Sequence, residues 1–128
     1  MATEHIYLKD LHGEHRQWMN ELGFYREEVS IYEHRLEELV QKNTGQDVLA
    51  EVERFQNQFI RQKEVFDTIE HDIRGHEQEL ADYAEDHPIA IDHKYFDDHT
   101  GLRDQVESER RIFGDLKVEF SKFLAKSL

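Results

Sequence analysis

Apolar and aromatic residues recur along most of this chain at alternating steps of three and four residues. Such runs extend from Leu8 to Leu39, from Val48 to His87 and from Tyr95 to Phe123, with His, Gln or Glu at a few of the positions. A repeat of about 3.5 residues keeps one stripe of an α-helix facing a partner helix along its whole length. The pattern therefore predicts three long helices with heptad seams, over about residues 4–42, 46–86 and 93–126.

The residues between these runs are typical of helix ends. In QKNTGQD, Asn43 or Gly45 can end the first helix, and Thr44 with Asp47 resembles a capping box for the second. Pro88 disfavours helical geometry in the residue before it, so the second helix should stop there. Asp92 can cap the third helix.

The two connections are short, which makes consecutive helices antiparallel. The expected fold is therefore all-α, a single domain over residues 1–128 built as an up-down-up bundle of three helices. One proline and six glycines in 128 residues favour such long elements. The first helix can begin at Thr3 or at Asp10. A short extra helix at either 3–10 or 92–99 is compatible with the same pattern.

A tryptophan occurs early in the first predicted helix, in the segment HRQWMNELGFY around Trp18. Three long heptad helices with a tryptophan at this place resemble a spectrin-type repeat. The outline is also similar to that of small bacterial helical-bundle proteins of uncharacterised function. The resemblance to spectrin repeats implies a spacer or interaction module and no enzymatic activity.

Composition excludes several classes of function. The chain has 29 Asp and Glu against 16 Lys and Arg, a formal charge of −13, so nucleic acid and anionic membranes would be repelled. It has no cysteine, which excludes disulfides and thiolate metal sites. The N-terminal MATEHIYLKD lacks the features of a secretory signal, and no apolar run reaches the roughly 20 residues that span a bilayer. The expected location is the cytoplasm.

Nine histidines are unusual in a chain of this length, and four of them, His15, His76, His87 and His99, occupy seam positions. In an antiparallel pair, residues equidistant from the connection face each other, which puts His15 opposite about residue 74, beside His76. By the same rule His76 lies opposite about residue 102, one turn from His99. The sequence therefore predicts that one histidine from each helix meets the other two at one level, at the end of the rod distal to residues 43–46.

Three imidazoles with an open position are typical of a zinc site, and imidazole also suits copper, nickel and iron. Asp72, four residues before His76, shares its helix face and could be a fourth ligand or orient the ring. The competing interpretation is a set of buried, hydrogen-bonded histidines that fix helix register. The Glu-x-x-His pairs of di-iron bundles do not occur in this chain.

Two further polar residues, Gln62 and Glu109, fall in the seams, where we interpret them as satisfied hydrogen-bonding groups that set register. Several apolar residues fall outside the seams, and if they join into a patch they form a partner or dimer surface. These residues are Phe24, Ile31, Ile60, Val65, Ile112 and Val118.

Two functions fit these observations. The favoured one is a non-enzymatic interaction or scaffold module, with a protein partner or a second copy of the chain bound at its surface. The alternative is a metal-binding bundle with His15, His76 and His99 as ligands, Asp72 as fourth ligand or orienter, and zinc or another imidazole-preferring transition metal as the ion. No motif in the chain points to a particular reaction.

Overall fold

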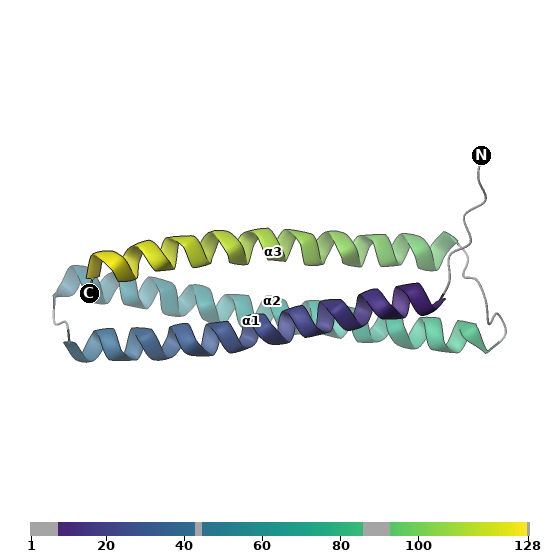
Figure 1. The fold of residues 1–128 in the computed structure, drawn as a ribbon, viewed down its shortest axis with the longest axis horizontal. Coiled ribbons are helices and arrows are strands. Elements are labelled where there is room, and N and C mark those ends of the chain that lie inside the picture. Colours follow the sequence, from purple (N-terminus) through teal and green to yellow (C-terminus); the bar gives the residue numbers. More distant parts are fainter. Residues whose placement is uncertain (1–7, 43–44, 86–92, 128) are drawn as a thin grey trace.

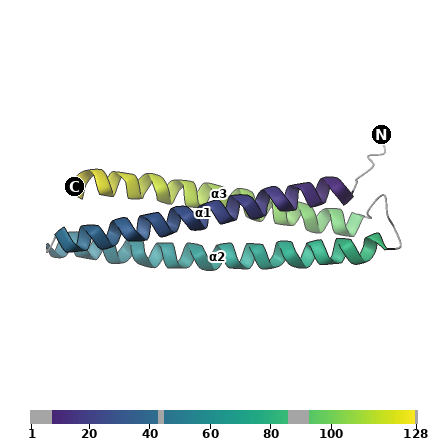
Figure 2. The same cartoon turned by 60° about the horizontal axis from the view of Figure 1, so that its bottom comes forward.

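Three long helices lie side by side in the computed structural model, which describes residues 8–42, 45–85 and 93–127. They are α1 (Leu8–Lys42), α2 (Gln46–Ala84) and α3 (His93–Ser127). Figure 1 shows α2 running antiparallel to α1, and α3 returning parallel to α1; the same arrangement appears from another side in Figure 2. The described ranges contain no strand. The predicted all-α, up-down-up bundle is confirmed.

The ends of the helices differ in detail from the expectations. Asp10 lies inside α1, which is already helical at Leu8, while a start at Thr3 falls outside the described residues, as do Pro88 and Asp92. Residues 93–99 form the first turns of α3 and not a separate short helix, because α3 is one continuous helix from His93 to Ser127. The N-cap of α2 is Gly45, which has no side-chain cap hydrogen bond, so the expected capping box does not begin α2.

The inward stripes of all three helices are buried, as the heptad pattern predicts. The largest fully buried side chains include Phe55, Phe59 and Phe120, which gather at the end of the bundle where α3 finishes. The rings of Phe59 and Phe120 meet edge to face with centroids 5.1 Å apart, a geometry worth about 0.5–1.5 kcal/mol beyond the burial of area. This half of the bundle is therefore held by aromatic packing.

A ladder of three ion pairs closes the outer edge between α1 and α3. The pairs are Glu14–Arg103, Glu21–Arg110 and Glu28–Lys117. All three join residues 89 apart in sequence and follow one another at heptad spacing. Each exposed pair contributes at most about 1 kcal/mol. Their shared offset nevertheless favours one register between the two parallel helices.

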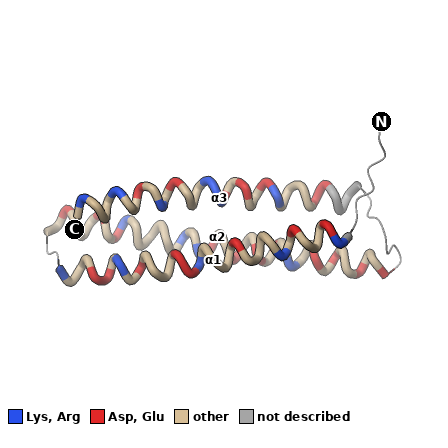
Figure 3. Tube along the Cα trace, viewed as in Figure 1, with Lys and Arg blue, Asp and Glu red and all other residues tan. Residues whose placement is uncertain are grey.

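The edge between α1 and α2 is closed in the same manner. Arg26 donates to Glu70 at 2.7 Å and also contacts Asp67, and Lys63 donates to Glu33 at 3.0 Å. Figure 3 shows acidic and basic residues distributed along all three helices. No helix in the described part of the chain combines the length and apolarity needed to cross a membrane.

Gln62 and Glu109 form a buried polar pair between α2 and α3. With its amide nitrogen turned toward the carboxylate, Gln62 donates to Oε1 of Glu109 at 3.2 Å and also to Oε2. Glu109 is 3% exposed, and this burial raises its pKa to about 7. The inward placement predicted for both residues is confirmed.

Replacing this carboxylate with an amide should stabilise the protein at alkaline pH. Between the ordinary pKa of 4.5 and the folded value of about 7, folded Glu109 keeps a proton that the unfolded chain releases, so its contribution to stability falls as pH rises through this window. We expect Glu109→Gln to raise the free energy of unfolding by about 2–3 kcal/mol at pH 8 and by little near pH 4.5. Urea unfolding at both pH values measures the difference. The exposed Glu107→Gln is the control, and an equal gain at both pH values would contradict the assignment.

Candidate metal centre

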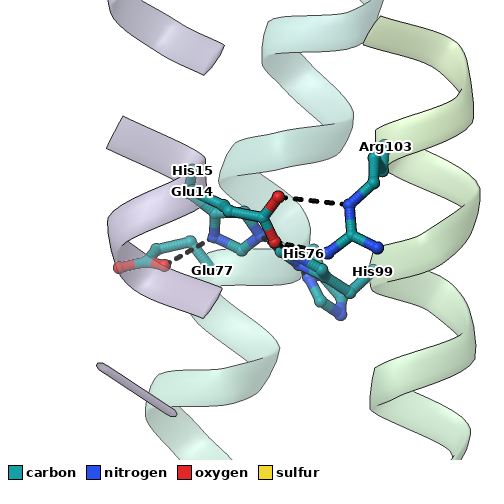
Figure 4. A network of polar contacts seen from close by, with 6 residues as sticks. All are labelled: Glu14, His15, His76, Glu77, His99 and Arg103. Atoms are coloured by element: carbon teal, nitrogen blue, oxygen red, sulfur yellow. Dashed lines mark hydrogen bonds and ion pairs between the residues drawn. The ribbon is translucent and has the colours of Figure 1, made fainter. Parts of the chain in front are cut away.

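Three of the seam histidines meet as the heptad alignment predicts. His15 comes from α1, His76 from α2 and His99 from α3, and all three are buried. One ring nitrogen of each lies within 4.8 Å of the corresponding nitrogens of the other two. Figure 4 shows the three rings grouped between the helices, with carboxylates on their outer sides.

His15 stands between the other two rings. Its Nε2 lies 3.1 Å from Nδ1 of His76 and 3.2 Å from Nδ1 of His99. Two nitrogens that bind one tetrahedral zinc at about 2.0–2.1 Å lie about 3.3–3.4 Å apart. These two separations are close to those at a shared ion, whereas the ligand nitrogens of His76 and His99 would have to approach each other, since the three nitrogens lie up to 4.8 Å apart.

Two carboxylates orient these rings from outside. Oε1 of Glu77 accepts from Nδ1 of His15 at 2.7 Å, and Oε1 of Glu14 accepts from Nε2 of His99 at 2.7 Å. Glu14 is itself held by the guanidinium of Arg103 at 2.5 and 3.1 Å (Figure 4). Carboxylates behind metal-binding histidines set the tautomer in this manner and make the ring a better donor of its electron pair.

The tautomers that these carboxylates require have a consequence inside the cluster. With Nδ1 of His15 and Nε2 of His99 protonated, Nε2 of His15 and Nδ1 of His99 each carry a lone pair, and these two atoms face each other at 3.2 Å. We call these two atoms the facing nitrogens. Two opposed lone pairs repel, although Nδ1 of His76 can donate to Nε2 of His15 at 3.1 Å. The repulsion ends when a proton or a metal cation lies between the facing nitrogens.

Burial disfavours the proton. It lowers the pKa of His15 and of His99 below the ordinary 6.5, against the opposing effect of Glu77 and Glu14. Burial also opposes ionisation of Glu14, yet hydrogen bonds from Arg103 and His99 lower its pKa, so it is a charged acceptor at neutral pH. Neutral inner rings with ionised carboxylates behind them form a donor set suited to a transition-metal cation.

The cluster has one apolar side and one that adjoins an acidic groove. The indole of Trp18 stacks on His99, with ring centroids 4.8 Å apart and planes at 27°. On the other side, a groove of about 440 Å³ between α2 and α3 is lined in part by His76. The other titratable residues of this groove are His71, Asp72, Glu79, Asp97 and Asp98. A path from solvent to His76 is therefore negative along its length, which suits the entry of a cation.

Not all of the predicted site residues lie in the histidine cluster. His15, His76 and His99 come together, whereas Asp72 is half-buried, lines the acidic groove with His76 and is not part of the three-histidine group. Its role as ligand or orienter stays a prediction. Glu77 was missed, although the antiparallel alignment places it near His12 and His15.

No family model, curated protein or solved structure matches this chain. The likeness to spectrin-type repeats therefore stays at the level of helix pattern.

On mild acidification, the buried histidines of the metal-free protein should lower its stability, against the opposite contribution of Glu109 over the same pH range. Because burial lowers the folded-state pKa of His15 and His99, the unfolded chain takes up protons below about pH 6.5 that the folded rings do not. Above that pH, the neutral rings make their full contribution to the stability of the protein. This contribution is lost as pH falls, until the pH lies below the folded-state pKa. We expect a loss of up to about 1.4 kcal/mol per pH unit for each ring.

Urea unfolding with a chelator at pH 7.5 and 5.5 measures this loss. His99→Phe should lower the free energy of unfolding at pH 7.5 relative to that at pH 5.5, whereas the same replacement at the exposed His34 should leave this relation unchanged. Equal pH dependence in all three proteins would show that the buried rings do not cause it.

Proposed function

We propose that this protein binds a transition-metal ion at the level where His15, His76 and His99 meet. The facing nitrogens carry the proposal, since the carboxylates behind them leave two lone pairs directed at one point. Three imidazoles suit Zn²⁺, and also copper, nickel and iron. One ligand from each helix would tie the three helices together, so the free energy of binding adds to that of folding.

Asp72 is the proposed fourth ligand or orienting group. It lies one turn before His76 on α2 and lines the acidic groove that reaches this ring. A carboxylate oxygen would complete a tetrahedral set of three nitrogens and one oxygen, a combination that zinc accepts.

Protein purified without an affinity tag and loaded with Zn²⁺ should contain one ion per chain. The melting temperature should rise by roughly 10 °C at a free-ion concentration about 100 times Kd. His76→Ala should abolish both effects, whereas His71→Ala, an exposed histidine of the same helix, should retain them. Elemental analysis and thermal melts give the two readouts. No bound ion and no change in melting would remove the proposal.

Two further variants resolve the surrounding carboxylates. Glu77→Gln keeps the shape of the side chain but weakens its hold on His15, and we expect about 10–100-fold weaker binding of Zn²⁺. Asp72→Asn should weaken binding only if Asp72 is a ligand or orienter. Asp104→Asn, an exposed acid on α3, controls for the loss of one negative charge.

A second candidate function, that of an interaction module, is favoured by exposed apolar side chains. Phe24 is 58% exposed and Ile31 is 56% exposed, and they lie one heptad apart on the same face of α1. Exposed aromatic and aliphatic groups that recur on one face of a helix are typical of an association surface. We propose that this outer face of α1 mediates self-association.

Sedimentation equilibrium over a range of concentrations tests this surface. The wild type should show a concentration-dependent dimer. The double variant Phe24→Ser, Ile31→Ser should weaken dimerisation by a factor of at least about ten, because both exposed apolar side chains are lost from the contact. Val118→Ser, which removes an equally exposed side chain from α3, should have no effect. A wild type that stays monomeric throughout would contradict self-association.

A further inference from the structure

The three outer edges of the bundle are not alike. Ion pairs close the edges between α1 and α3 and between α1 and α2, in both cases from heptad positions that flank the inward stripe. On the edge between α2 and α3, the equivalent flanking positions hold Val65 and Ile112. Val65 packs against the core, and Ile112 is 47% exposed. One ion pair, Arg54–Glu119 at 3.7 Å, joins α2 to α3 near the end of α3, and the middle of this edge is apolar.

A groove of about 670 Å³ follows this edge. Val65, Ile69 and Ile112 are its apolar lining, and its flanks carry the small residues Thr68, Gly101 and Ser108. A Cβ added at Gly101 would meet nothing within 4 Å, so the space beside this residue is open. Small side chains on both sides of an apolar strip allow another helix to approach closely. The ridge of side chains on that helix can then pack into the groove.

The groove is long enough for a helix. It shares Asp72, Gly101 and Gln105 with the acidic groove beside His76, so the two form one continuous depression. Along α2 this depression extends from Arg61 to Glu79, about 27 Å at a rise of about 1.5 Å per residue. A helix of about 18 residues would fill it.

The charge of the depression identifies the kind of helix. Its acidic side chains are Glu64, Asp72, Glu79, Asp97, Asp98 and Asp104, and Arg61 is the one Lys or Arg among the residues that line it. The carboxylate of Glu109 lies beneath it, paired with the neutral amide of Gln62. A second copy of this chain, with a net charge of −13, would bring further negative charge, whereas a cationic helix complements the rim.

We propose that the depression between α2 and α3 binds a basic amphipathic helix of another protein, which packs as a fourth helix of the bundle. An apolar stripe of the partner lies on Val65, Ile69 and Ile112, and Lys or Arg on both sides of the stripe meet the acidic rim. This inference rests on the second candidate function, that of an interaction module, and names a surface separate from the outer face of α1.

A synthetic peptide of about 18 residues, with Leu at the heptad a and d positions and Lys or Ala elsewhere, is the probe. A scrambled peptide of identical composition controls for attraction to an acidic protein. At about 0.15 M salt, fluorescence anisotropy should give at least tenfold tighter binding for the patterned peptide. Equal affinity of the two peptides would overturn the proposal, because charge alone would then explain binding.

Paired variants locate the binding surface. Ile112→Ser should weaken binding of the patterned peptide about five- to tenfold, and Ser108→Trp, which fills the groove, should weaken it at least as much. Ile31→Ser and Ser30→Trp make the same changes at exposed positions of α1 and should have no effect. Thermal melts verify that each variant is folded. Equal losses within each pair would overturn the assignment.

Sedimentation of Ile112→Ser separates this proposal from the other two. If this substitution abolishes dimerisation of the chain alone, the groove holds a second copy and the proposed partner is wrong. Zn²⁺ binding and the effect of Phe24→Ser, Ile31→Ser on association are measured without the peptide. Failure of the groove proposal is therefore distinguishable from failure of either proposed function.

Discussion

A continuous heptad register is the constraint on which the rest of this bundle depends. Each helix must keep one stripe inward over about 50–60 Å, so any side chain in a stripe meets residues at the same level on the other two helices. Polar residues in the stripes can be satisfied only by one another, by groups that flank the stripes or by a ligand. This is why His15, His76 and His99 form one layer and Gln62 and Glu109 form another.

The two halves of the rod are held by different forces. Near the end of α3, Phe55, Phe59 and Phe120 fill the interior with apolar rings, whose contribution to stability does not depend on protonation. In the other half, the histidine layer replaces apolar volume with rings that can titrate and carboxylates that hold them. A cation shared by the three rings would supply to this half the cohesion that the aromatic rings supply to the other.

The open edge between α2 and α3 reaches the buried histidine layer at one of its rings, that of His76. Ion pairs lie along the two edges of α1, whereas the middle of the edge between α2 and α3 carries the apolar groove and the acidic path that reaches His76. The same negative charge that would draw a metal cation toward His76 would also attract a cationic helix. Both proposals therefore rely on the difference between this edge and the two edges of α1. That difference arises in part because Glu14, Glu21 and Glu28 pair with basic residues of α3.

The apolar spacing by itself determined three helices, their antiparallel order and the level at which one histidine from each would lie, because these follow from periodicity and from distance to the connections. Only the tertiary structure decided that Glu14 meets His99 and Arg103, that Glu77 meets His15, and that the edge between α2 and α3 stays open. A heptad position specifies on which side of its helix a residue lies, but not which neighbour stands there. That depends on whether the third helix packs to the left or the right of the first two, and both hands present the same seams.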